Sequence, residues 1–370
     1  MKTDKRNYGL DLYRIMAMVM ITILHLVGYR YNMLKDSTSS AVFCIGWLGE
    51  AFSFCGVNCF ALLTGFLSGT SRFDYDEKWF MKVFQLWLKI LLWGIPIYLL
   101  AVIIMPELNF SVKSFILYFF PKGTGWWYIY AYFGLLMLLP ILSGTVTRLP
   151  VRSQVFGGCA IFAVFLILDK IPTENSFCLG GGFSCFWLII CFVFGQIIST
   201  WAPRFVVWKP SIYILLAGVV LGGGLPFAAQ LVYYFFKLDY RLWIAVSYLS
   251  PFILMEAVCL LILFSQIRIR SEIIKKVVVF LSTNSLGVYL FQCHSVIWSV
   301  FFLPETPVYS NEYELLWRFP VALVVIFAIG VLGDYVINRI CSSFAVVYAG
   351  KAIFYCFAKV ASVLSFKDIK

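Results

Sequence analysis

Residues 9–29, GLDLYRIMAMVMITILHLVGY, are long and apolar enough to cross a bilayer, yet they contain Asp11, Arg14 and His25. A transmembrane helix needs about 20 mostly apolar residues, and this segment supplies them. Ionisable groups at membrane depth are costly, so they usually face a bundle interior or a water-filled cavity. The segment therefore predicts both a membrane helix and a polar site built on that helix.

The whole chain has the composition of a membrane protein. Of its 370 residues 62% are hydrophobic and 13% charged, whereas soluble domains average about 45–50% apolar and about 25% charged. The apolar runs predict an all-α fold, a polytopic membrane helical bundle of about ten transmembrane helices. The expected spans are 9–29, 41–67, 80–104, 126–146, 154–169, 184–200, 211–229, 242–265, 277–303 and 316–338.

The distribution of basic residues predicts the topology. With the N-terminus in the cytoplasm, the inner segments hold 19 Lys and Arg and the outer segments hold 8, so both termini are expected to be cytoplasmic. The net charge of +11 comes from residues between apolar runs, and we expect no nucleic-acid partner. Residues 1–341 are predicted to form the membrane domain. Residues 342–370 are predicted to form an interfacial and cytoplasmic tail, with Lys351 and Lys359 on an amphipathic helix.

The cysteines give no sign of a metal site. Most of the 11 cysteines lie inside apolar runs, where a thiol behaves as a small hydrophobic group. Because no CxxC pair or Cys/His spacing occurs, we expect no bound metal. Cys178 and Cys185 flank one predicted outer loop. They could pair in an oxidising compartment or remain free thiols.

Arg14 and His25 have a spacing that places them on one helical face. Eleven positions correspond to three turns plus about 20°, and the two Cα atoms are expected about 16 Å apart along the axis. Arg14 would then lie near the inner surface, where it could bind a phosphate. His25 would lie further out, where an imidazole can take up a proton near neutral pH. Alternatively, Arg14 extends to the interface and His25 bonds a neighbouring helix.

Several segments, taken in order, resemble the integral-membrane acyltransferase-3 family. In that family the first helix carries a basic residue, then ten residues, then histidine, as Arg14 and His25 do here. The resemblance covers about residues 9–300. The segments that carry it are GLDLYRIMAMVMITILH (9–25), GVNCFALLTGFLSG (56–69), FMKVFQLWLKILLWGIPIY (80–98), WWYIYAYFGLLMLLPIL (126–142), YLSPFILMEAVCLLILF (248–264) and NSLGVYLFQCHSVIW (284–298).

The resemblance implies transfer of an acetyl group from cytosolic acetyl-CoA, as co-substrate, to a hydroxyl of a glycan or glycolipid. Bacterial surface polysaccharide O-acetylation is the common case, so the expected location is the bacterial plasma (inner) membrane, in contact with membrane lipid. His25 would be the general base or the group that transiently carries the acyl unit. Asp11 would orient Arg14. Arg14, Lys82, Lys89 and Arg72 would bind the donor.

The residues expected to bind the acceptor are of several types. Glu50 could polarise His25 or bind sugar hydroxyls, or it could be an interfacial carboxylate. Trp126 and Trp127 could stack on a sugar or form an interfacial belt. The remaining expected substrate-binding residues are Tyr289, Gln292 and His294. Gln292 stands where the family often has histidine, and Lys82, Gln85 and Lys89 stand in a stretch where it often has closely spaced arginines.

Other buried polar residues have structural explanations. Glu256 could form an ion pair with Lys89, and Asn58 and Thr64 are expected to hydrogen-bond between helices. A secondary transporter or flippase for a lipid-linked sugar or small anion would also contain buried charges. No repeated half supports that alternative. A sensor or assembly partner without catalysis is the third alternative.

Overall fold

The computed structural model describes residues 6–35, 38–69, 73–105, 108–120, 125–167, 177–207, 211–237, 246–303, 309 and 311–364, and these ranges contain no β-strand. The long helices are α1 (Tyr8–His25), α2 (Ser40–Ser53), α3 (Gly56–Ser68), α4 (Glu77–Ile104), α6 (Trp127–Leu142), α7 (Val151–Phe162), α8 (Cys185–Val207), α9 (Ser211–Phe236), α10 (Pro251–Ser265), α11 (Glu272–Thr283), α14 (Leu315–Cys341) and α15 (Phe344–Leu364). Short helices are α5 (Val112–Leu117), α12 (Leu286–Gln292) and α13 (Ser295–Ile297). The chain is an all-α, multi-pass membrane bundle.

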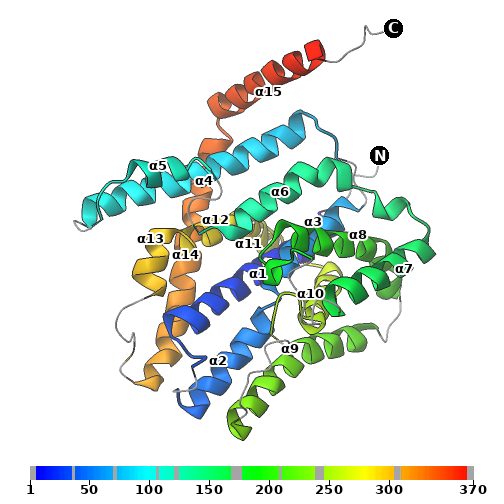
Figure 1. Cartoon of the computed structure of the whole chain (residues 1–370), viewed down its shortest axis with the longest axis vertical. Coiled ribbons are helices and arrows are strands. Elements are labelled where there is room, and N and C mark those ends of the chain that lie inside the picture. Colours follow the sequence, from blue (N-terminus) through cyan, green and yellow to red (C-terminus); the bar gives the residue numbers. More distant parts are fainter. Residues whose placement is uncertain are drawn as a thin grey trace.

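Helix α1 lies near the middle of the bundle (Figure 1) and packs against α2, α3, α10, α11, α12 and α14. It begins where the Asn7 side chain accepts a hydrogen bond from the backbone N–H of Gly9, an N-cap that satisfies one of the free amide groups at a helix start. A π-helical turn over Leu26–Arg30 follows His25 directly. Such wider turns are rare among helices in general, and those that occur are frequently found at functional sites.

Glycines let two helix pairs approach closely. A Cβ on Gly65 of α3 would overlap the carbonyl oxygen of Phe192 on α8, and a Cβ on Gly195 would overlap that of Leu62. Helices α12 and α14 meet in the same way at Gly287 and Gly330. In a bilayer the hydrophobic effect does not drive helices together. Close van der Waals packing of this kind therefore supplies much of the attraction between them.

Two of the predicted spans are broken helices. The span expected over 41–67 divides into α2 and α3, and the span expected over 277–303 divides into α11 and α12, which are bent by 41°. Asn284 lies at the second break, where its side chain donates to the carbonyl of Phe280. The bond competes with continued helix, as asparagine side chains commonly do. Both breaks lie inside spans predicted from the apolar runs, and Ser40–Ser68 as a whole is long and apolar enough to cross a membrane.

The number of membrane crossings stays a prediction. Six helical segments are long and apolar enough to span a bilayer, and the bent pair α11–α12 would make seven. The other three predicted spans correspond to shorter apolar helices over Val151–Leu166, Cys185–Trp201 and Pro251–Ser265. The last of these begins at Pro251, later than expected, because Ser247–Ser250 form a turn. A count of ten requires all three shorter helices to cross.

The start of α1 and the end of α14, where the chain enters and leaves the bundle, lie close together. Tyr8, at the start of α1, and Ser342, just after α14, line one cavity. Helix α15 extends beyond the bundle beside the start of α4 (Figure 1), where Lys351 forms an ion pair with Glu77 at 2.9 Å. This placement agrees with both ends lying on one membrane side. Which side is cytoplasmic stays a prediction, as does the interfacial position of α15.

The expected interhelical polar contacts are partly present. Asn58 donates to the carbonyl of Tyr248 at 2.9 Å and accepts from the indole of Trp187 at 2.9 Å. Thr64 instead donates to the carbonyl of Phe60 within its own helix. No disulfide joins Cys178 and Cys185.

Lys89 forms its ion pair with Asp334, at 3.0 Å, and the expected bridge to Glu256 was wrong. The indole of Trp93 and the amide of Asn338 also donate to the carboxylate of Asp334, so this fully buried side chain has three partners. Glu256 is fully buried near the thiol of Cys55. Neither of its oxygens has a hydrogen-bond partner of good geometry within the described ranges.

Removing one partner of the buried pair is expected to destabilise the bundle. Asp334→Ala leaves the Lys89 ammonium without its counter-ion, and breaking such a pair costs about 3–5 kcal/mol. The melting temperature of the purified protein in detergent should fall clearly, and Lys89→Met with Asp334→Ala should recover part of the loss. Glu272→Gln, which breaks the exposed pair with Lys275, should leave the melting temperature unchanged. An unaltered melting temperature for Asp334→Ala would contradict the stabilising role of the pair.

Candidate active site: two cavities on helix α1

A cavity of about 660 Å³, here called the Arg14 cavity, lies between α1, α3, α4, α6, α11 and α12. Its basic side chains are Arg14, Lys82 and Lys89. Most of the remaining wall is apolar or aromatic, with hydroxyls from Thr64, Ser282 and other residues. A wall of this kind suits a long ligand with a charged end and a largely neutral arm.

Asp11 holds Arg14 at the edge of this cavity. The buried Asp11 carboxylate accepts from Arg6 at 2.7 and 2.9 Å and from the hydroxyl of Ser282 at 2.9 Å. Arg14 lies 3.4 Å from the same carboxylate and donates to Ser282 at 2.8 Å. The hydrogen bond from Arg6 to Asp11 raises the pKa of Arg6 above its ordinary value. Asp11 is thus a positioning residue that joins α1 to α11.

The other expected donor-binding cations occupy different environments. Lys82 is exposed, with its ammonium 4.5 Å from the centre of the Phe73 ring and no hydrogen bond or ion pair to any described residue. Lys89 is already paired with Asp334. Arg72 lies outside the described residues. Lys82 is therefore the cation most available to an anion entering the cavity, while Arg14 shares the Asp11 carboxylate with Arg6.

His25 opens into a second cavity of about 380 Å³, here called the His25 cavity. The imidazole packs edge-on against Trp298, with ring centres 4.9 Å apart, and against Phe302 at 5.7 Å. Its Nδ1 atom is enclosed and has no hydrogen-bond partner within the described ranges. Tyr29, one helical turn after His25, lines the same cavity. The His25 ring is thus held by aromatic contacts in the wall of this cavity.

Two further polar side chains gather at this site. Glu50, in the last turn of α2, lines the His25 cavity, and its Oε2 atom is enclosed without a partner among the described residues. Gln292 of α12 is fully buried beside His25, and neither of its amide atoms has a partner of good geometry there. Buried polar groups normally find partners. Unsatisfied groups clustered around one histidine therefore indicate a site that binds a polar ligand.

A thin layer of protein, here called the septum, separates the two cavities. On α1, Ile21 lines the Arg14 cavity and Leu24 the His25 cavity. In the same way, Tyr289 of α12 lines the Arg14 cavity, and Cys293, just after α12, lines the His25 cavity. Tyr289 and Cys293 are about one helical turn, or roughly 5 Å, apart along the chain axis. Within the septum the backbone N–H of Tyr128 donates to the hydroxyl of Tyr289 at 3.2 Å. The Tyr128 hydroxyl has no partner among the described residues.

Comparison with known proteins assigns the chain to a family. Residues 7–338 match the acyltransferase-3 family, which is described as an acyltransferase domain. The chain belongs to this family. No curated protein and no solved structure gives a significant match. The protein is therefore a membrane acyltransferase, and the two cavities on α1 are the candidate site for its reaction.

The other residues expected to bind substrate in this acyltransferase do not lie together in the structure. Trp127 lines the His25 cavity, whereas Trp126 is fully buried and its indole donates to the carbonyl of Leu290. Tyr289 lines the Arg14 cavity. His294 is buried outside both cavities, with Nε2 bonded to the carbonyl of Gly94 and Nδ1 accepting from the backbone of Val296. The placements of Trp126 and His294 do not support contact with substrate, because their polar atoms already have backbone partners.

The acyltransferase site also contains residues that the sequence reading missed. Tyr29, Tyr248, Cys293 and Trp298 line the His25 cavity. Tyr29 could have been found, since it follows His25 by four residues and such residues share a helical face. Tyr248 precedes α10 in a turn, and no periodicity relates it to α1. Within the described ranges, no group of three or more His, Cys, Asp or Glu residues could hold a metal ion.

Glu50 and Glu256 provide a matched test of the His25 cavity. Glu50→Gln is expected to lower the turnover number at least about tenfold, because Glu50 lines the cavity and a hydrogen bond to a charged group contributes about 1.5–3 kcal/mol. Glu256→Gln should change turnover little, because Glu256 lies outside both α1 cavities. Equal effects of the two substitutions on turnover would contradict the assignment of Glu50 to the site.

Proposed function

We propose that this acyltransferase moves an acetyl group from cytosolic acetyl-CoA to a hydroxyl of a glycan or glycolipid at the membrane. The observation that supports the proposal is the pair of cavities on α1. One contains cations and the other contains an unpartnered histidine nitrogen, and they approach each other within about one helical turn.

The Arg14 cavity is the proposed donor site. The phosphates of acetyl-CoA would lie against Arg14 and Lys82, because charge-assisted hydrogen bonds to phosphate are strong and Arg can bind two oxygens at once. Lys89 would add positive charge, already balanced in part by Asp334. The neutral arm of the donor would follow the apolar wall toward Tyr128 and Tyr289, so that the thioester reaches the septum.

The His25 cavity is the proposed acceptor site. Trp127, Phe183 and Trp298 offer aromatic surfaces that suit the apolar faces of a sugar ring. Glu50, Tyr29 and Ser295 offer polar atoms that can bond hydroxyl groups. An aromatic wall with a few convergent polar groups is typical of a specific ligand site.

His25 is proposed to act as the general base. One imidazole nitrogen removes the proton of the acceptor hydroxyl as that oxygen attacks the thioester carbon. The new C–O ester bond forms, the C–S bond breaks, and the CoA sulfur leaves as a thiolate that takes up a proton. The Gln292 amide and the Tyr128 hydroxyl, which have no partner of good geometry among the described residues, are the proposed donors to the oxyanion of the intermediate. The reaction needs no metal in this proposal.

The proposed setting is the plasma (inner) membrane of a bacterium, with a surface glycan or its lipid-linked precursor as acceptor. The donor would enter from the cytoplasm, and the acceptor would approach the predicted outer half of the bundle. Membrane lipid surrounds the protein, and no nucleic acid takes part.

The two histidines of the chain give a direct test of the function. Purified protein with radiolabelled acetyl-CoA and a glycan extract should form labelled glycan, and His25→Ala should lower the rate by about 10²–10⁴-fold. His294→Ala should retain most of the rate and lose some stability, because the bonds to Gly94 and Val296 are lost. Undiminished transfer by His25→Ala, with normal folding, would remove His25 from the mechanism.

The same assay separates the remaining alternatives. A general base leaves no label on the protein when acceptor is omitted, whereas label retained in a His25-dependent manner would make His25 the acyl carrier. A transporter would move label across a proteoliposome without forming a covalent product. That result would refute the proposed reaction.

Arg14 provides the corresponding test of the donor site. Arg14→Ala is expected to weaken acetyl-CoA binding about 10–100-fold, since a hydrogen bond to a charged group contributes about 1.5–3 kcal/mol. Arg268→Ala, an exposed arginine outside both cavities, is the control and should bind normally. Calorimetric titration in detergent measures both. Unchanged affinity in Arg14→Ala would contradict the donor assignment.

A further inference from the structure

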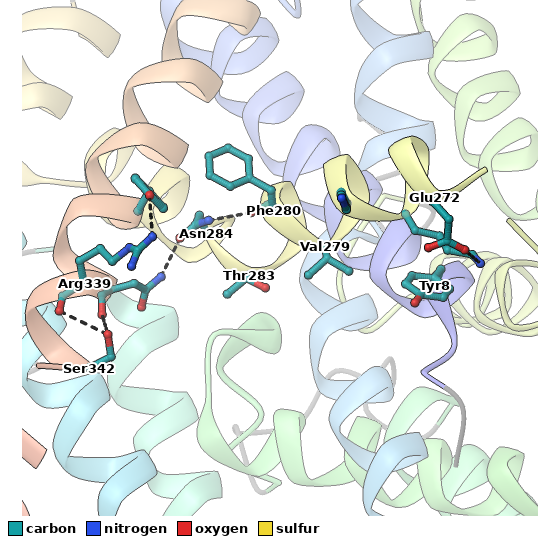
Figure 2. A pocket seen from close by; sticks show the side chains of 12 residues that line it. Tyr8, Glu272, Val279, Phe280, Thr283, Asn284, Arg339 and Ser342 are labelled. Atoms are coloured by element: carbon teal, nitrogen blue, oxygen red, sulfur yellow. Dashed lines mark hydrogen bonds and ion pairs between the residues drawn. The ribbon is translucent and has the colours of Figure 1, made fainter. Parts of the chain in front are cut away.

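A third cavity, of about 580 Å³ and here called the Lys276 cavity, lies outside the two that form the proposed active site. Figure 2 shows α11 crossing it, with Arg339 and Ser342 of the α14 end on one side and Tyr8 and Glu272 on the other. It shares only Thr283 with the Arg14 cavity. The proposed acyl transfer gives this cavity no role.

The Lys276 cavity carries a surplus of positive charge. Lys275, Lys276 and Arg339 line it, against one carboxylate, that of Glu272. Glu272 is paired with Lys275 at 2.5 Å. Arg339 donates only to the hydroxyl of Tyr335, at 3.0 Å, and Lys276 has no hydrogen bond or ion pair to any described residue. Two cations are therefore left without a counter-ion in the described part of the chain.

The surface beside this cavity is apolar. Ile273 and Val277 of α11 are 76% and 50% exposed, and Val336 and Ile340 of α14 are 57% and 44% exposed. Such side chains on a membrane bundle are expected to face lipid tails. A ligand in the Lys276 cavity would thus have cations at its head and apolar surface along its flanks.

The position of the cavity defines the ligand further. It lies at the end of the bundle where Tyr8 and Ser342 meet, which the distribution of basic residues predicts to be the cytoplasmic side. The cytoplasmic leaflet carries anionic lipids, and basic pockets between membrane helices on this side bind their headgroups. A soluble phosphate would satisfy the cations but would leave the apolar flanks unused.

We propose that the Lys276 cavity binds the phosphate headgroup of an anionic phospholipid. Lys276 and Arg339 contact the phosphate, Thr283 can donate to the headgroup from its hydroxyl, and the acyl chains lie along the exposed apolar sides of α11 and α14.

The bound lipid would also touch the wall shared with the donor site. Asn338 lines the Lys276 cavity and donates to Asn284 at 2.7 Å and to Asp334 at 3.0 Å. Asp334 in turn holds Lys89, which lines the Arg14 cavity. Since the headgroup joins α11 to α14, lipid binding is expected to raise the melting temperature of the bundle.

Lipid binding to the intact protein tests the proposal without measuring transfer. Protein purified in neutral detergent is titrated with dioleoylphosphatidylglycerol, and bound lipid and melting temperature are recorded by native mass spectrometry and thermal denaturation. The double variant Lys276→Gln, Arg339→Gln should bind roughly 30-fold more weakly, as expected for the loss of two cations near a lipid surface. It should also lose the increase in melting temperature. Lys78→Gln with Arg268→Gln removes two exposed cations from predicted inner segments outside the cavity, and should bind as the native protein does.

Three results would overturn the proposal. Dioleoylphosphatidylcholine, which has no net charge, should bind weakly to every variant, so equal binding would mean that the anionic headgroup is not recognised. Glycerol 3-phosphate should compete poorly, and competition as strong as that of the phospholipid would make the ligand a soluble phosphate. Unchanged phosphatidylglycerol binding by the cavity double variant, with the same melting temperature in lipid-free detergent, would refute the site.

Discussion

The Asp11 carboxylate is the contact that sets the geometry of the α1 site. It is buried and joins Arg6, Arg14 and Ser282, so it fixes the rotation of α1 against α11. Because a helix is rigid along its length, this rotation also sets the direction of His25 about four turns away. A charge inside a membrane bundle is stable only when its partners surround it, and here the surrounding groups also build the site.

In the proposed reaction, the septum lets one helix serve two substrates of different chemistry. A CoA ester is charged and water-soluble, whereas a glycan acceptor at the membrane presents hydroxyl groups. Separate cavities would let each substrate approach from its own direction, while only about one helical turn divides them. The π-helical turn follows His25 directly, at the point where the proposal has the histidine meet the acceptor.

Much of this arrangement was readable from sequence because hydrophobic length and helical period are local properties. The all-α membrane bundle follows from the apolar runs. The proposed role of Arg14 and His25 rests on their cost in lipid and stays a prediction. The break after α2 was not readable, since apolar residues lie on both sides of it, whereas the break after α11 falls at the polar stretch STNS, residues 282–285. Lys89 illustrates the same limit. Its need for a carboxylate partner was foreseeable. The partner is Asp334, 245 residues away in sequence, and Lys89 pairs with Asp334 and not with Glu256 because of how α4 and α14 pack.

The sequence by itself determined that this chain enters the membrane, that it belongs to the acyltransferase-3 family, and that α1 carries a cation and an imidazole at two depths. Only the tertiary structure decided that these two side chains open into different cavities, that Glu50 joins His25, and that His294 does not. The physical reason is that spacing along one helix fixes direction and depth. The wall opposite each side chain comes from helices distant in sequence, whose packing is set by close glycine contacts and by buried polar partners.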